Sequence, residues 1–66
     1  MKLIINGEIR EFNNGDTLQN ILLALGLDGK VMAAAVNMEI VKQDMWGSFK
    51  PNDGDKLELL DFVGGG

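Results

Sequence analysis

The first residues of the chain have the pattern expected of a β-hairpin, with two short β-rich runs on either side of a turn signal. The run Lys2-Leu3-Ile4-Ile5 precedes Asn6-Gly7, and a second strand candidate follows from Glu8 to Phe12. Asn-Gly between two such runs is a strong hairpin signal, because both central residues of a type I′ turn have positive φ. We therefore expect two antiparallel strands joined by a two-residue turn.

The turn also sets the register of the predicted hairpin. Since successive side chains alternate between faces, Arg10 shares a face with Leu3 and Ile5, which a purely apolar core would not include. Either the Arg10 stem lines an edge while its charge reaches water, or the register is not the simple one. The expected cross-strand pairs are Ile5 with Glu8, Leu3 with Arg10, and Met1 with Phe12.

An amphipathic helix is predicted after the hairpin. Its apolar residues recur at i, i+3, i+4 and i+7, which is the spacing of one helix face. Asp16 or Thr17 is the expected N-cap, since either side chain accepts a hydrogen bond from the first turn. Gly26 is expected to end the helix in a left-handed conformation, with Leu27 making the accompanying apolar contact. The four apolar positions are Leu18, Ile21, Leu22 and Leu25.

The middle of the chain predicts a second hairpin and a short helical turn. The run from Val31 to Val36 is short, bounded by Gly29 and Asn37 and flanked by valines, which favours a buried strand over a helix built on alanine propensity. Asn37-Met38 is a second tight turn, after which Glu39 to Val41 returns. Gln43 to Trp46 resembles one helical turn that places the indole ring on the core.

The last strand candidate runs from Lys56 to Val63, after the turn signal Pro51 to Asp55. Alternation puts Leu57 and Leu59 on one face, with Glu58, Leu60 and Phe62 on the other. We expect this strand to lie beside the first strand and parallel to it. The predicted fold class is therefore α+β: a β-grasp with a mixed sheet of four to five strands, one main helix packed across it, and a short helical turn near Trp46.

Composition narrows the possible functions. The 66 residues have room for one small domain, and they include no Cys, His or Tyr, so thiolate or imidazole catalysis and a transition-metal site are not expected. Ten acidic residues outnumber six basic ones, which argues against nucleic acid and favours a partner with a positive surface. The longest apolar run is far too short to span a membrane, and no signal peptide is recognisable. We expect a cytoplasmic protein.

The chain ends in three glycines, Gly64, Gly65 and Gly66, directly after a strand-like run. We expect a β-grasp domain over residues 1–63 and a flexible glycine tail over 64–66. The tail has one simple alternative, a frayed end or cloning remnant. The functional interpretation is steric, because a backbone without Cβ atoms threads a slot too narrow for any side chain. The best candidate for covalent chemistry is then the carboxylate of Gly66, acting as a substrate.

A series of motifs in a fixed order resembles one known family. The motifs are Asn6, Gly15-Asp16-Thr17, Ala33 to Asn37, Ile40-Val41, Trp46, Gly54-Asp55, Leu57-Glu58-Leu59 and Val63 to Gly66. Together they resemble the ThiS family, ubiquitin-like sulfur carriers of thiamine thiazole biosynthesis, over essentially the whole chain. Two positions depart from the family pattern: Met38 stands where Gly is frequent, and Arg10 where an apolar residue is more usual.

The resemblance implies a reaction cycle at Gly66. An ATP-dependent, ThiF-like activating enzyme would adenylate the carboxylate. Sulfur from a cysteine desulfurase or another donor would then give a thiocarboxylate, and a ThiG-like thiazole synthase would consume it. The resemblance implies a carrier that is not an enzyme and binds no cofactor or metal, with ATP and Mg²⁺ belonging to the activating partner. Gly64 and Gly65 would thread that partner's active site.

The predicted partner interface lies on the outer side of the sheet, where Leu60 and Phe62 join Ile4, because exposed apolar patches mark interfaces. Three other functions stay open. The small subunit of molybdopterin synthase has the same fold and tail but is usually longer. A ubiquitin-like modifier would attach the tail to lysines, and a non-covalent binding module would not need the tail.

Overall fold

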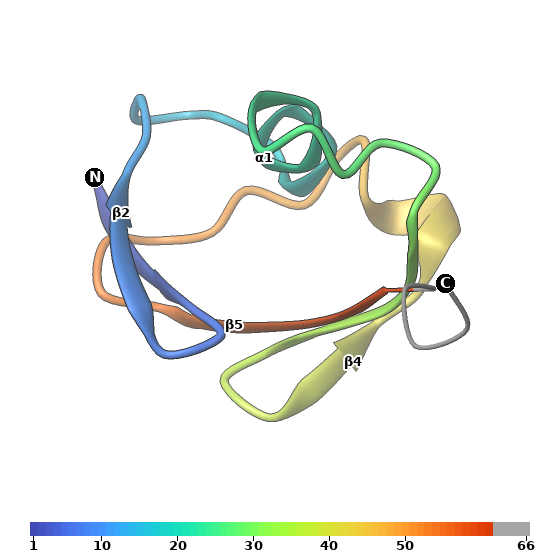
Figure 1. Ribbon diagram of the computed structural model, residues 1–66. Coiled ribbons are helices and arrows are strands. Elements are labelled where there is room, and N and C mark those ends of the chain that lie inside the picture. The colour runs from blue at the N-terminus through green and yellow to red at the C-terminus, as the bar shows by residue number, and fades with distance from the viewer. Residues whose placement is uncertain (62–66) are drawn as a thin grey trace.

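The computed structural model describes residues 1–61, and they form one mixed sheet with a helix across one face (Figure 1). The sheet has five strands in the order β2-β1-β5-β3-β4. β5 lies beside β1 and parallel to it, as predicted. The elements in chain order are β1 (Lys2–Ile5), β2 (Glu8–Glu11), α1 (Leu18–Ala24), β3 (Val31–Val36), β4 (Glu39–Val41), the 3₁₀ helix η1 (Gln43–Met45) and β5 (Lys56–Asp61).

The first hairpin has the predicted register. Leu3 faces Arg10 and Ile5 faces Glu8, across a turn whose central residues Asn6 and Gly7 have φ of 49° and 87°. The Arg10 side chain is 50% exposed and forms an ion pair with Glu8 at 3.0 Å. β2 is an edge strand, so the guanidinium reaches water while the register stays simple. The first of the two alternatives for Arg10 is therefore confirmed.

Helix α1 begins at a capping box and ends at a glycine. Thr17, not Asp16, is the N-cap: its Oγ1 accepts from the Asn20 N–H at 3.1 Å, and Asn20 Oδ1 accepts from the Thr17 N–H at 3.0 Å. At the other end Gly26 has φ of 73°, and the Leu27 N–H donates to the Leu22 carbonyl at 2.9 Å. These bonds satisfy backbone groups that a helix of seven residues would otherwise leave free.

The segment after η1 completes the cap of α1. The Leu18 N–H donates to the Phe49 carbonyl at 2.8 Å, and the Gln19 N–H donates to the Trp46 carbonyl at 3.0 Å. Trp46 is 4% exposed, and its Nε1 donates to the Val41 carbonyl at 2.9 Å. The prediction that Trp46 is a core residue is confirmed, and the same segment also anchors the start of the helix.

The core lies between α1 and the sheet. The final strand contributes Leu57 and Leu59, whereas Leu60 faces away from the core, as the alternation predicted. No helix among residues 1–61 is long and apolar enough to cross a membrane. The buried apolar residues are Leu3, Ile5, Leu18, Ile21, Leu22, Val31, Ala34, Val36, Trp46, Leu57 and Leu59.

The second hairpin closes on a turn with two left-handed residues. Asn37 and Met38 have φ of 50° and 72°, and Val36 pairs with Glu39, which is the pattern of a type I′ turn. Met38 is 90% exposed, so its side chain gains little from packing. The departure from the family pattern at Met38 therefore leaves the turn type unchanged, and the residue carries backbone strain instead.

Replacing Met38 with Gly is expected to stabilise the domain by about 0.5–1 kcal/mol. The left-handed conformation costs a residue with a Cβ roughly 1–2 kcal/mol, and the extra flexibility of Gly in the unfolded chain offsets part of the gain. Urea titration followed by circular dichroism measures the change. Met38→Ala is the matched control, because it removes the side chain but keeps the Cβ. Equal stabilisation by both variants would show that backbone strain is not the cause.

Candidate functional site

β5 is the element that leads to the glycine tail, so its neighbours define the candidate site. It occupies the centre of the sheet, with β1 on one side and β3 on the other. Phe62 and the glycines Gly64, Gly65 and Gly66 lie outside the described residues. Within the described residues the candidate site extends to the end of β5 at Asp61.

The β3 side of β5 is held by an antiparallel ladder. The pairing runs almost the full length of both strands, with one irregularity between Val31 and Ala33. This long ladder fixes β5 along its β3 edge up to the last described residue. The paired residues are Val31 with Asp61, Ala33 with Leu60, Ala34 with Leu59, Ala35 with Glu58, and Val36 with Leu57.

The β1 side is held by fewer strand contacts. The Ile4 N–H donates to the Asp55 carbonyl at 3.0 Å, and the Asn6 N–H donates to the Leu57 carbonyl at 2.9 Å. Beyond Asn6 the chain turns away into β2. The next backbone groups of β5 on this side belong to Leu59, and they bind the Asn6 side chain: the Leu59 N–H donates to Oδ1 at 2.8 Å, and Nδ2 donates to the Leu59 carbonyl at 3.2 Å.

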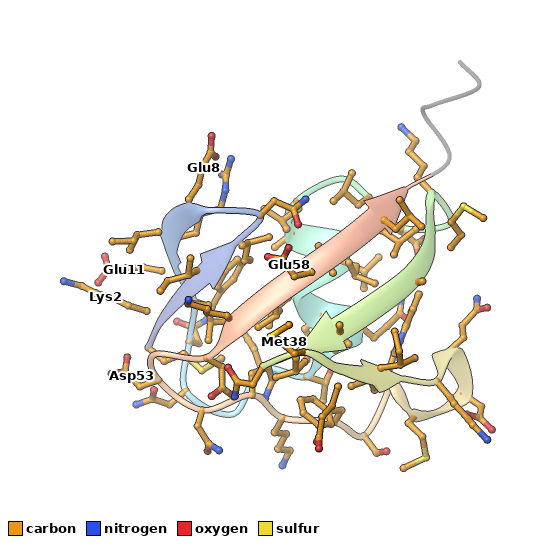
Figure 2. The ribbon with its side chains drawn as sticks, turned by 90° about the horizontal axis from the view of Figure 1, so that it is seen from below. Lys2, Glu8, Glu11, Met38, Asp53 and Glu58 are labelled. Atoms are coloured by element: carbon orange, nitrogen blue, oxygen red, sulfur yellow. The ribbon has the colours of Figure 1, made fainter. Side chains whose placement is uncertain are left out.

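The two described residues of the predicted interface, Leu60 and Ile4, lie on the outer face of the sheet, opposite α1. Leu60 is 59% exposed, and Ile4 is half-buried on the same face. The two are not neighbours, because Ile4 pairs with Lys56, at the opposite end of β5 from Leu60. Figure 2, which views the outer face, shows Glu58 over the middle of β5 between these positions. The two residues therefore share a face, as predicted, but they form two separate apolar areas on it and not one continuous patch.

Leu60 instead borders a shallow apolar hollow of about 290 Å³. The family motifs in the sequence include its other walls but do not place them together; the pairing of Ala35 with Ile40 and of Ala33 with Leu60 does. Ile40 is largely exposed and adds to the apolar surface. Predicting this hollow would have required the register of β3, β4 and β5. The hollow is lined by Asn6, Ala33, Ala34, Ala35, Ile40, Glu58, Leu59 and Leu60.

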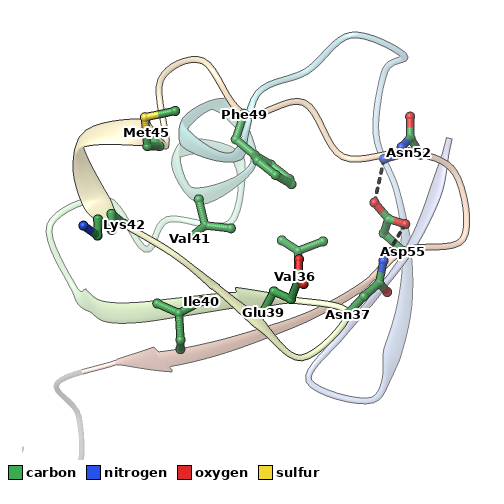
Figure 3. A pocket seen from close by; sticks show the side chains of 10 residues that line it. All are labelled: Val36, Asn37, Glu39, Ile40, Val41, Lys42, Met45, Phe49, Asn52 and Asp55. Atoms are coloured by element: carbon green, nitrogen blue, oxygen red, sulfur yellow. Dashed lines mark hydrogen bonds between the residues drawn. The ribbon is translucent and has the colours of Figure 1, made fainter.

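A second hollow, of about 680 Å³, lies beside β4 and the turn before β5 (Figure 3). Asp55 at its rim accepts from Asn37 Nδ2 at 3.0 Å and from the Asn52 N–H at 2.8 Å. These contacts hold the start of β5, the end away from the tail. Within residues 1–61 no group of three or more His, Cys, Asp or Glu side chains could hold a metal ion.

With the geometry established, comparison with known proteins identifies the family. The model of the ThiS family matches residues 3–66. The chain belongs to the ThiS family. This agrees with the resemblance found in the sequence, and the match extends through the glycines that the structure does not describe.

Individual ThiS relatives agree with the assignment in fold and name. The sulfur carrier protein ThiS of Escherichia coli is 27% identical to the chain, over the full length of both. The crystal structure of a thiamine biosynthesis protein (ThiS) from Geobacter metallireducens matches with a TM-score of 0.78 and 27% identity, again covering both chains completely. The predicted β-grasp fold is confirmed.

Two longer relatives carry a different name. Thiazole synthase of Paramagnetospirillum magneticum is 46% identical over the whole chain, and thiazole synthase of Magnetococcus marinus is 32% identical. The chain spans about a fifth of the length of these two proteins, since the matches cover 20% of each. In both, a ThiS-like segment is therefore part of a larger polypeptide.

Proposed function

We propose that the protein is a sulfur carrier for thiamine thiazole biosynthesis and that its reacting group is the Gly66 carboxylate. The observation that carries this proposal is the ThiS family match, which runs through the glycine tail to residue 66. The full-length similarity to a sulfur carrier of Escherichia coli supports it. The placement of the tail after a central strand supports presentation to another protein's active site.

The chemistry takes place in three steps. A carboxylate oxygen of Gly66 attacks the α-phosphorus of ATP on a ThiF-like enzyme, and pyrophosphate leaves. The outer sulfur of a persulfide on a cysteine desulfurase or other donor then attacks the acyl carbon and displaces AMP. A thiol next attacks the donor-side sulfur of the resulting acyl disulfide, which breaks the S–S bond and leaves a thiocarboxylate on Gly66 and a disulfide on the donor. Finally the sulfur is transferred to the substrate of a thiazole synthase. Activation is needed because a carboxylate is a poor acyl donor until its oxygen becomes part of a good leaving group.

In this cycle the protein is a co-substrate and not a catalyst. The sequence has no Cys or His to act as nucleophile or imidazole base, so the reactive groups come from the partners. ATP and Mg²⁺ belong to the activating enzyme, where the metal stabilises charge on the phosphates. The carrier contributes a rigid body, a surface to dock and the Gly64-Gly65-Gly66 segment.

A thiazole synthase is the proposed recipient of the sulfur. Two proteins of that name contain a segment similar to this chain within one polypeptide. Joining two modules in one chain raises their effective concentration for each other, which is useful when they act in sequence. Such a fusion supports the proposal that the same two modules also interact when they are separate proteins.

The proposed docking surface is the outer face of the sheet, with Leu60, Phe62 and Ile4 as its apolar contacts. Of the two described residues, Leu60 is the more exposed, and it lies beside the hollow. Acidic residues lie on this face and at its edge, with Glu58 at the centre and Glu8 and Glu11 near the β2 edge (Figure 2). A partner that places basic groups between and beside two apolar contacts fits this surface.

Leu60→Asp is expected to raise the KM for the carrier in adenylation about tenfold or more, because a charge would be buried against the partner. Leu23→Asp on α1 is the matched control, since Leu23 is 53% exposed and Leu60 is 59% exposed. Steady-state kinetics with the ThiF-like enzyme and a melting curve for each variant provide the measurement. Equal KM values for the two variants would exclude the outer face as the docking surface.

Intact-mass analysis tests the function directly. The protein is incubated with the ThiF-like enzyme, Mg-ATP and a sulfide source, and then digested to localise any modification. We expect replacement of one oxygen by sulfur at Gly66, and thiazole formation when thiazole synthase and its substrates are added. An unchanged mass with an enzyme that modifies its own carrier would refute the proposal. Attachment of the tail to lysines would instead identify a modifier.

A further inference from the structure

We propose that Asn6 is a positioning residue: its side chain extends the β1–β5 ladder toward the tail and thereby holds the end of β5 from which the chain continues to Gly66. The inference rests on the proposed function, because it assigns a role in presenting the reacting carboxylate. It concerns a residue at a hairpin turn, 53 positions away in sequence from the residue it binds.

The ladder between β1 and β5 has a regular spacing that Asn6 completes. The backbone groups of β5 that face β1 belong to every second residue, with bonds at the carbonyls of Asp55 and Leu57. The next residue in this series is Leu59, and no strand is left to pair with it because β1 has ended at Ile5. The Asn6 amide takes this place and bonds both the N–H and the carbonyl of Leu59.

The geometry matches what a backbone peptide would supply. A side-chain amide carries one acceptor oxygen and donor N–H groups on a planar unit, like the peptide group of a neighbouring strand. Asn6 is able to present it there because its own backbone is left-handed, with φ of 49°, a conformation that Asn tolerates better than most residues. The turn conformation and the long-range contact are therefore two uses of the same residue.

Asn37 is a natural counterpart at the other end of β5. It is also the first residue of a type I′ turn, with φ of 50°, and its side chain also makes two hydrogen bonds. Oδ1 accepts from the Lys56 N–H at 3.0 Å, and Nδ2 donates to Asp55 Oδ1 at 3.0 Å (Figure 3). Asn37 thus binds where β5 begins, whereas Asn6 binds two residues before its last described residue.

The two asparagines allow a matched experiment. Asn6→Gly and Asn37→Gly each remove a side chain with two hydrogen bonds, and Gly accepts the left-handed turn in both. With the ThiF-like enzyme we expect Asn6→Gly to lower kcat for adenylation about tenfold with KM for the carrier within about twofold, because a misplaced reacting group slows the reaction more than docking. Asn37→Gly should leave both parameters within about twofold of the wild type.

Asn6→Asp provides the conservative variant. A carboxylate keeps an acceptor for the Leu59 N–H but loses the donor to the Leu59 carbonyl, so its kcat should lie between those of the wild type and Asn6→Gly. Equal kcat values for Asn6→Gly and Asn37→Gly would overturn the inference. So would a change confined to KM, since that would assign Asn6 to docking.

Amide hydrogen exchange supplies a readout that needs no partner enzyme. The reporter is the Leu60 amide, because Leu60 pairs with Ala33 of β3 and not with Asn6. We expect about tenfold faster exchange of Leu60 in Asn6→Gly than in Asn37→Gly, at a temperature where both are folded. Equal exchange would overturn the inference even if adenylation is confirmed. If the wild type is not adenylated at all, the proposed function fails, and the exchange result alone decides the role of Asn6.

Discussion

Deleting Gly65 and Gly66 is expected to reduce adenylation at least about a hundredfold while leaving the melting temperature unchanged. Each extended residue spans about 3.5 Å, so the new terminal carboxylate would stop roughly 7 Å short of the α-phosphorus. A misplacement of only about 1 Å already costs about a hundredfold in well-oriented reactions. ATP–pyrophosphate exchange with the ThiF-like enzyme measures the loss, and circular dichroism measures the fold.

Gly65→Ala is the control that separates the effect of tail length from the effect of a narrow slot in the partner's active site. It keeps the length of the tail and adds one Cβ, so a narrow slot in the partner would slow the reaction while a wide one would tolerate it. Full activity of the shortened protein would contradict the proposed chemistry. It would favour the interpretation as a non-covalent β-grasp binding module, for which the glycines are incidental.

Trp46→Ala is expected to destabilise the domain by about 3–5 kcal/mol, as for other buried aromatic side chains cut back to Ala. A domain of 66 residues has about 3–10 kcal/mol of stability in total, so the expected loss is from about a third of the stability to all of it. The indole also donates to the Val41 carbonyl, which would lose its partner. Because this is the protein's single tryptophan, the titration must follow circular dichroism and not fluorescence.

Trp46→Phe distinguishes the contribution of the buried ring from that of the indole hydrogen bond. Phenylalanine keeps most of the buried ring but has no N–H, so the expected loss is about 1–3 kcal/mol from the unsatisfied Val41 carbonyl and the smaller volume. A loss below about half a kilocalorie for Trp46→Ala would show that this side chain does not stabilise the core, contrary to its 4% exposure.

Most of the fold could be predicted from short-range patterns. The Asn6-Gly7 turn set the register of the first hairpin, and it matches residue by residue. The helix was recognisable because its apolar spacing, its cap at Thr17 and its end at Gly26 all lie within ten residues of one another. The choice between Asp16 and Thr17 was not predictable, because both side chains are good caps and each has an amide residue three positions later. In the structure Asn20 completes the capping box with Thr17.

For the candidate site, the sequence led to a prediction of the chemistry but not of the arrangement of its residues. The terminal glycines and the lack of Cys and His indicated a substrate carboxylate without any structure. In contrast, Leu60 and Ile4 share a face yet do not meet, and Leu60 lies beside Ala33 instead. Alternation along one strand gives the face of a residue, but its neighbours on that face depend on the order and register of other strands.

The sequence by itself determined the local conformations, because turns, caps and amphipathic spacing act over a few residues, and it led to the prediction of the reacting group. The tertiary structure decided the contacts between distant segments. Phe49 and Trp46 complete the cap of α1, and Asn6 reaches Leu59 across 53 positions. The sequence predicted that β5 lies parallel to β1, but the residues that meet across these elements depend on the packing of the whole chain, which no local pattern encodes.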